Sequence, residues 1–230
     1  MVAPVTTPLT ADLLDIYGAL RDAFGHQHWW PAETAFETMV GAILTQNVSW
    51  TNAAQAVENL KSAGMLDPGH LAAAETEDIA LLIIPSRFYN QKAERIRGFA
   101  RVYVAEYQAD PVVMAAIETG ALRERLLALR GLGKETVDTI LLYACGKPVF
   151  VVDAYTRRIF SRYGLLPEGA SYDRMQHLFA DNLAPDRELF NDYHAQIVCL
   201  AKTVCRKTPL CERCPIRVVR GSLRCAGARA

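Results

Sequence analysis

The amino-acid sequence predicts an all-α protein. Apolar residues recur every three or four positions through most of the 230 residues, as they do on the buried face of an amphipathic helix. Convincing period-two alternation is missing, and the short apolar run from Val149 to Val152 is the one candidate for a β-strand. With 51% hydrophobic residues, the chain can form a substantial core or two small lobes.

The expected helices follow one another with short polar breaks. After a loose tail at residues 1–8, Thr10 is expected to cap a first helix that buries Leu13 and Leu20. A second helix should begin near Thr34, and the polar stretch Thr45 to Trp50 separates it from a third. Further helices are expected at Leu71–Ile84 (two short ones), after the loop at 85–92, at Val112–Leu129 (two, broken near Gly120), at Lys134–Cys145, at Ala154–Tyr163, at Tyr172–Leu183 and at Asp186–Thr203.

Charge and targeting signals limit the function classes. The 25 Lys and Arg residues balance the 25 Asp and Glu residues, so a nucleic-acid surface would have to be a local concentration of positive charge. The sequence has no basic and apolar signal at its N-terminus and no apolar run of about 18 residues. We therefore expect a soluble, cytoplasmic protein without membrane contact, and nothing in the sequence indicates more than a monomer.

Residues 126–160 contain the most informative pattern. Two apolar helical stretches flank the turn Arg130-Gly131-Leu132-Gly133, and Lys134 begins the second stretch. Glycines allow a sharp turn and a close approach of the backbone to a ligand. A helix start with unpaired N–H groups and a lysine favours an anion such as phosphate. The alternative is an ordinary helical hairpin with a glycine turn.

A lone aspartate, Asp153, ends the apolar run after this hairpin and precedes the helix expected at Ala154–Tyr163. One interpretation is a helix cap, a role that suits aspartate at any helix start. The other is a functional carboxylate, held by a rigid apolar segment near a phosphate-binding hairpin, so that one nucleotide could meet both.

Four of the six cysteines lie close together near the C-terminus. Cys205, Cys211 and Cys214 are spaced as C-x5-C-x2-C, and a longer gap leads to Cys225. In an intracellular chain this spacing indicates one soft metal centre rather than disulfides. Buried structural thiols fit less well, because charged residues are interleaved with the cysteines. Spacing alone does not distinguish zinc from a [4Fe–4S] cluster.

The pattern L-x-G-L-G-K-E-T, followed by an apolar helix and V-V-D-A-Y, resembles the hairpin and catalytic aspartate of the endonuclease III-like helix-hairpin-helix DNA glycosylases. The resemblance extends from about Leu13 to Cys214. It implies an all-α, two-lobed fold, with one lobe at 27–130 whose hairpin continues to about 150, and a second lobe from 1–26 and 151–230. It also implies base excision repair, with double-stranded DNA as partner and a damaged base flipped into a cleft between the lobes.

The resemblance further favours a [4Fe–4S] cluster over zinc on the four clustered cysteines, in a loop at 205–225. The first gap between these cysteines is one residue shorter than is usual in the family, and the last gap is much longer. The cluster would hold a basic loop, containing Arg206, Lys207 and Arg213, against DNA phosphates. The alternative for these three residues is a solvated charged loop.

The residue at position 135 bears on the reaction type. In bifunctional members of the family, a lysine two residues after the second hairpin glycine forms a Schiff base with the sugar. Glu135 stands there in this chain, and Lys134 points about 100° away around the helix. A carboxylate cannot form an imine, so we expect a monofunctional glycosylase with weak or absent AP lyase activity.

Two carboxylates would then be available for catalysis. Asp153 would stabilise the positive charge that develops on the sugar and would orient or deprotonate water. Glu135 is expected in the base pocket, where burial would raise its pKa. The alternative is an ordinary first-turn glutamate, favoured there by the helix dipole.

The three tryptophans, Trp29, Trp30 and Trp50, could share a core or form a stacking pocket. Trp50 lies in the polar break QNVSW rather than on an apolar stripe, which favours the pocket. Indole rings suit a cationic base through stacking and cation–π attraction. N-alkylated purines such as 3-methyladenine bear that charge, and their glycosidic bonds are already weakened.

Several segments together resemble the 3-methyladenine DNA glycosylase III branch of the family: WWP, GAILTQN, FYNQKA, GLGKE, and YACGK followed by VVD. This resemblance implies that Trp29 or Trp30 flanks the flipped base together with Trp50. It also implies that Asn47 is a wedge that fills the gap left in the duplex. The residues expected to contact DNA are Gly131, Leu132, Gly133, Lys134 and Gln46. The cysteine loop, by contrast, resembles that of ordinary endonuclease III.

Two other functions remain open. One is an endonuclease III-type bifunctional glycosylase and AP lyase acting on oxidised pyrimidines, which Glu135 opposes. The other is a non-catalytic DNA-binding module, which Asp153 opposes because a pure binder needs no carboxylate facing DNA.

Overall fold

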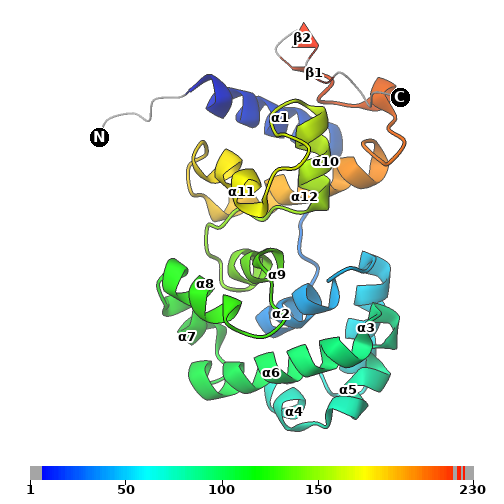
Figure 1. Cartoon of the computed structure of the whole chain (residues 1–230), viewed down its shortest axis with the longest axis vertical. Helices are drawn as coiled ribbons and strands as arrows, with labels where there is room; N and C mark the ends of the chain where they lie inside the picture. Colours follow the sequence, from blue (N-terminus) through cyan, green and yellow to red (C-terminus); the bar gives the residue numbers. More distant parts are fainter. Residues whose placement is uncertain (1–6, 220–221, 224, 226–230) are drawn as a thin grey trace. The chain divides into compact units, whose positions relative to one another are not determined.

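The computed structural model describes residues 7–219, 222, 223 and 225, and it confirms the all-α prediction (Figure 1). The described residues divide into two compact units. The central unit is Trp30–Lys147, and the terminal unit combines the residues up to Trp29 with those from Pro148 onward. Within the described ranges, no helix is both long enough and apolar enough to cross a lipid bilayer.

The central unit is built around the long helix α6, Tyr89–Tyr107. Helices α4 (Pro68–Ala73) and α5 (Thr76–Leu82) pack against α6, as Figure 1 shows. Parallel aromatic rings form part of the core of the central unit, where Phe36 and Phe99 are each stacked on Tyr103. The other elements are α2 (Ala35–Leu44), α3 (Trp50–Ser62), the 3-10 turn η1 (Ile84–Ser86), α7 (Pro111–Ala116), α8 (Thr119–Leu127), α9 (Lys134–Thr139) and the π-helical turn η2 (Ile140–Ala144) that continues α9.

The terminal unit is organised by α12, Arg187–Thr203, against which α1 and α10 pack. Its core is aromatic: the rings of Phe150 and Phe179 stack at 3.9 Å, and Tyr193 meets both edge-on. The other elements are α1 (Pro8–Phe24), α10 (Ala154–Arg162), α11 (Tyr172–Ala180), the 3-10 turn η3 (Cys211–Arg213), and the two-residue strands β1 (Val218–Val219) and β2 (Ser222–Leu223).

Three details differ from the sequence-based expectations. The first helix begins at Pro8 with Thr7 as its cap, not Thr10, because the fixed φ of proline suits a first helical position. The run Val149–Val152 is not a strand; it is an extended connector whose residues Phe150 to Val152 are buried. The paired strands β1 and β2 were not predicted, because two residues are too few to show a period-two pattern.

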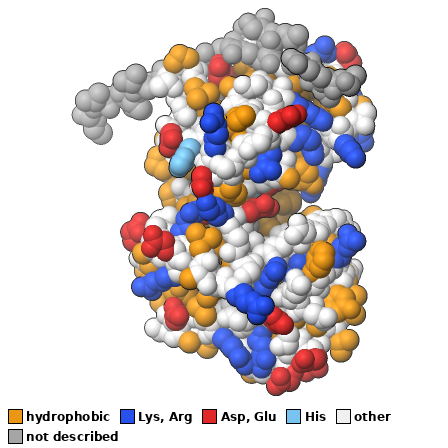
Figure 2. All heavy atoms as spheres, in the orientation of Figure 1, with side chains coloured by type: hydrophobic (Ala, Val, Ile, Leu, Met, Phe, Trp, Pro, Cys, Tyr) orange, Lys and Arg blue, Asp and Glu red, His pale blue; other side chains and the backbone are white. Residues whose placement is uncertain are grey.

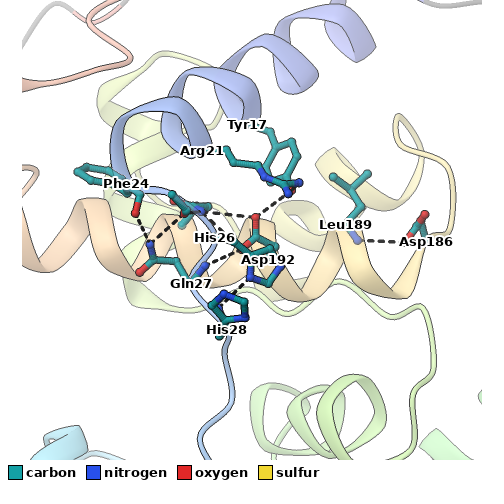
Figure 3. A network of polar contacts seen from close by, with 11 residues as sticks. Tyr17, Arg21, Phe24, His26, Gln27, His28, Asp186, Leu189 and Asp192 are labelled. Atoms are coloured by element: carbon teal, nitrogen blue, oxygen red, sulfur yellow. Dashed lines mark hydrogen bonds and ion pairs between the residues drawn. The ribbon is translucent and has the colours of Figure 1, made fainter.

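A buried carboxylate fixes the end of α1 and the segment after it. Asp192 of α12 is only 2% exposed. The hydroxyl of Tyr17 and the backbone N–H of Gln27 donate to its two oxygens at 2.8 and 3.1 Å, and the His26 ring lies 3.7 Å away (Figure 3). Burial, and then Asp192, raise the pKa of Tyr17. This network holds the polar segment at 25–28 on the terminal unit.

A second buried ion pair joins α8 to α9 in the central unit. The guanidinium of Arg123 donates to both oxygens of Asp138, at 2.6 and 2.9 Å, and the Asp138 side chain is fully buried. Because α8 and α9 are the two helices of the glycine hairpin, this ion pair fixes them to each other.

Replacing Arg123 with methionine should therefore be costly. The change withdraws the guanidinium from a buried carboxylate, which is expected to lower the free energy of unfolding by about 3–5 kcal/mol. Arg101→Met is the matched control, since the exposed Arg101 donates to the carbonyl of Ala72, and it should cost less than about 1 kcal/mol. Urea unfolding of both variants measures the difference, and equal losses would contradict a structural role for the buried pair.

Candidate functional site

The glycine hairpin turns sharply between α8 and α9. Gly131 has a φ of +84°, and a Cβ at this position would collide with the side chain of Arg95. Gly133 caps α9 without any side-chain hydrogen bond, and the space where its Cβ would lie is open. Leu132 is buried and anchors the turn. The start of α9 therefore offers backbone donors that no capping side chain occupies, as an anion-binding hairpin requires.

Gln46 ties the polar segment after α2 to this hairpin. Its side-chain amide donates to the carbonyl of Gly131 at 3.1 Å and to the hydroxyl of Thr136 at 2.8 Å. The guanidinium of Arg95 donates to the amide oxygen of Gln46 at 2.5 Å. Asn47 follows; it is exposed and has a left-handed backbone, with φ +52°. The segment thus presents Asn47 outward while Gln46 holds it in place.

Two of the three tryptophans meet in the central unit. The ring of Trp30 packs edge-on against Trp50, with centroids 4.9 Å apart, and lies 5.5 Å from the ring of Tyr143. Gly41 of α2 lies directly behind Trp30, where a Cβ would be 3.4 Å from the indole. A hollow of about 160 Å³ adjoins this cluster, and Glu37 and Glu58 contribute to its lining. Aromatic faces beside carboxylates suit a flat cation.

The remaining tryptophan, Trp29, belongs to the terminal unit. The ammonium of Lys202, on α12, lies 5.6 Å from the centre of its ring, in a cation–π contact. Of the two hairpin residues that follow Gly133, Lys134 is half-buried. Glu135 is exposed in the first turn of α9, so the structure does not bury it as expected and agrees with the alternative of a first-turn glutamate.

Asp153 is confirmed as the cap of α10, in a capping box with Thr156. Its Oδ1 accepts from the backbone N–H of Thr156 at 2.7 Å and from the Thr156 hydroxyl at 2.9 Å. Its Oδ2 lies 3.8 Å from Nε2 of the buried His194. Burial alone would raise the pKa of Asp153, but His194 and then the Thr156 donors lower it below its usual range. Oδ1 therefore caps α10, and the carboxylate stays ionised although the side chain is mostly buried.

The four C-terminal cysteines lie close enough together for their thiols to influence one another electrostatically. Burial, and then the thiols of Cys205, Cys225 and Cys211, raise the pKa of Cys214 to about 11. Arg162 donates to the sulfur of Cys205 at 3.4 Å, and the Cys225 thiol donates to the carbonyl of Arg162 at 3.6 Å. Even so, among the described residues no three or more His, Cys, Asp or Glu side chains are arranged so that they could hold a metal ion.

Phe88 had no expected role, and it is 60% exposed. Arg87 and Phe88 both have a positive φ, +55° and +48°, which is unusual for two successive residues that are not glycine; Gln108 and Ala109 are the other such pair among the described residues. Strain of this kind is typical of functional loops. An aromatic residue within the polar loop PSRFYNQK was the available sequence signal.

The comparisons with known proteins agree with these features. Residues 40–185 match the model of the HhH-GPD superfamily base excision DNA repair proteins. The chain belongs to this superfamily, and it is a DNA glycosylase of base excision repair. It is 45% identical, over 88% of its length, to a putative DNA repair glycosylase, MJ1434 of Methanocaldococcus jannaschii, of which it covers 92%. It is 30% identical to endonuclease III of Sulfolobus acidocaldarius over 79% of each chain.

Solved structures give two further matches. The Helicobacter pylori 3-methyladenine DNA glycosylase MagIII, bound to 1,N6-ethenoadenine, superposes with a TM-score of 0.70 at 29% identity, over 85% of this chain and 98% of that one. Endonuclease III trapped covalently on DNA superposes with a TM-score of 0.78 at 18% identity, over 92% and 96% of the two chains, and this second match supports the fold alone.

The two hairpin glycines provide a matched pair of variants. Gly131→Ala should lower the free energy of unfolding by about 1–3 kcal/mol, because it places a Cβ at positive φ and against Arg95. Gly133→Ala should change it by less than about 0.5 kcal/mol, because its backbone is extended and the space is open. Denaturant unfolding compares the two, and similar losses would show that Gly131 is not constrained as described.

Proposed function

We propose that this chain is a monofunctional glycosylase that removes N-alkylated purines such as 3-methyladenine from double-stranded DNA. The observation that supports it most is Glu135, which stands at the position of the Schiff-base lysine of the bifunctional relatives. The Trp30–Trp50–Tyr143 cluster supports the substrate class, since electron-rich rings attract a cationic base. The 29% identity to MagIII agrees with it.

The proposed reaction is hydrolysis of the bond between C1′ of the sugar and the purine nitrogen. The electron pair of this bond leaves with the base, which departs neutral because the alkylated purine was cationic. Positive charge develops on the sugar, and the ionised carboxylate of Asp153 stabilises it. Water adds to C1′ and passes its proton to Asp153 or to solvent. His194 and Thr156 contribute by keeping Asp153 ionised.

The hairpin, Gln46, Asn47 and Phe88 would bind and open the duplex. Backbone N–H groups at the start of α9, with Lys134 beside them, suit a DNA phosphate. Gln46 holds the neighbouring segment to the hairpin. Asn47 and Phe88 are both exposed on left-handed backbone, and we assign them as wedges that enter the helix as the base leaves the stack. Glu135 and Trp29 are proposed to contact the extruded nucleotide.

We further propose a [4Fe–4S] cluster on Cys205, Cys211, Cys214 and Cys225. Four cysteine thiolates are the usual ligands of such a cluster, and the thiols of Cys205, Cys225 and Cys211 contribute to the raised pKa of Cys214, although the described side chains are not arranged around a metal position. When bound, the cluster would add charge and covalent cross-links that hold its loop folded. Arg162 already donates to the carbonyls of Arg206 and Lys207 in this loop. Zinc is the less favoured alternative.

An endonuclease III-type activity is the second candidate, favoured by the 30% identity to the Sulfolobus enzyme. A duplex with one 3-methyladenine analogue or one thymine glycol distinguishes the two. We expect release of the alkylpurine and strand cleavage only after alkali. Excision of thymine glycol with direct cleavage would overturn the proposal, since another amine would then replace the missing lysine.

Asp153→Asn should lower base release by at least about a hundredfold while DNA binding persists. Asparagine is a good helix cap, so α10 should stay intact. Asp186→Asn is the matched control, because Asp186 caps α12 in the same unit and is exposed. Single-turnover kinetics on the alkylated duplex measure both variants, and full activity in Asp153→Asn would sink the proposed mechanism.

The purified protein should be brown, with broad visible absorbance that bleaches on oxidation and with iron and sulfide in equal amounts. Cys214→Ser should remove the colour and lower the melting temperature. Cys199→Ser on α12 should leave the colour and the melting temperature unchanged. A colourless preparation that contains zinc would refute the iron–sulfur assignment.

A further inference from the structure

Lys92, in the first turns of α6, is a buried lysine whose hydrogen bonds run to main-chain carbonyls. Its side chain is 1% exposed. The ammonium donates to the carbonyl of Leu44 at 2.7 Å and to the carbonyl of Ser86 at 2.5 Å. Burial, and then the neighbouring Arg95, lower its pKa to about 8. A buried ammonium is costly, and here the carbonyls of Leu44 and Ser86 supply hydrogen bonds that offset the lost hydration.

The two carbonyls end two separate segments. Leu44 is the last residue of α2, where carbonyls lack helical partners and a positive charge is favourable. Ser86 is the last residue of the 3-10 turn η1 and is completely buried. Asn47 follows the first segment by three residues, and Phe88 follows the second by two. The ammonium of Lys92 therefore links the two segments that lead to Asn47 and Phe88, both of which have a positive φ.

Arg95 makes a second connection one turn further along α6. It donates to Gln46, which in turn donates to Gly131 of the hairpin. Lys92 and Arg95 thus hold three segments of the central unit on one face of a single helix: the segment with Asn47, the segment with Phe88, and the hairpin.

We propose that Lys92 is a positioning residue that sets the spacing between Asn47 and Phe88, and that opening of the DNA duplex depends on it. The inference rests on the proposed function, in which both side chains enter the duplex. Unstacking a base step costs a few kcal/mol, so wedges that are already in place lose less of their binding energy to ordering. A displacement of about 1 Å in a positioned group can cost up to about a hundredfold in rate.

The test compares Lys92→Met with Lys147→Met. Lys147 is a partly exposed lysine of the same central unit, and its ammonium donates to the main-chain carbonyl of Ile117 at 2.8 Å. Each variant is assayed on one alkylated purine placed either in a fully paired duplex or in a bubble of mismatches that is already open. Lys92→Met should slow release from the duplex about tenfold or more and release from the bubble less than about threefold. Lys147→Met should slow neither.

An equal loss on both substrates, which leaves the ratio of the duplex rate to the bubble rate unchanged, would overturn the inference, because Lys92 would then only stabilise the fold. If methionine prevents folding, Lys92→Gln is used, because its amide can still donate to one carbonyl and fill part of the space. Phe88→Ala is combined with the Lys92 variant in a double-mutant cycle. The two effects on the duplex should be clearly less than additive, and full additivity would contradict action through Phe88.

A binding experiment separates this inference from the proposed substrate. The fluorescence of a 2-aminopurine next to the lesion rises when the duplex opens, and it is measured in the Asp153→Asn background, where no base is released. The inference would be supported if the Asp153→Asn protein opens the duplex and the Asp153→Asn, Lys92→Met protein does not, even if the wild-type enzyme released no alkylpurine. Equal opening with and without Lys92→Met would overturn it even if the alkylpurine activity is found.

Discussion

A helix cannot satisfy the backbone groups of its own first and last turns, and the candidate functional residues of this protein lie where that constraint acts. Asp153 caps α10 through one oxygen, so its position is fixed by the helix it begins. Gly133 begins α9 without a capping side chain, which leaves donors for an anion. Lys92 reaches the last carbonyl of α2, and the segment that follows this carbonyl is held to the hairpin. Figure 2 shows positive and negative side chains interspersed on the visible faces of both units, so binding of a polyanion would depend on such local geometry more than on net charge.

The all-α fold and several helix boundaries could be predicted from the sequence because they depend on local patterns. The second helix begins next to Thr34, Asp153 is a cap as expected, and α9 begins at Lys134. The cap of the first helix is Thr7, three residues before the expected Thr10, because Pro8 extends the helix. The short strands near residues 218–223 were missed because their pairing depends on tertiary context that no sequence period records.

Some residues of the candidate site could likewise be identified from the sequence, and others could not. Residue types with a known chemical preference, such as Gly131 and Asp153, could be singled out from the sequence. Three residues could not be placed. His194 has no local signal for its contact with Asp153, which is 41 positions away in the chain. Lys92 looks like any helical lysine until the structure buries it, and the exposure of Phe88 follows from a backbone conformation that two non-glycine residues rarely adopt.

The helix α2 is ten residues long, and two residues of its second half, Gly41 and Leu44, contact different parts of the candidate site. Gly41 gives room to the indole of Trp30, and one turn later the carbonyl of Leu44 accepts from Lys92. A side chain larger than alanine at residue 41 would press on the indole of Trp30, and residue 41 lies one turn before the carbonyl that anchors the segment with Asn47. In the proposed function, a change of base preference through this helix would therefore be constrained by the need to keep opening the duplex. Lineages that altered the preference would be expected to change residues of the cluster away from α2, such as Tyr143, before they changed the glycine.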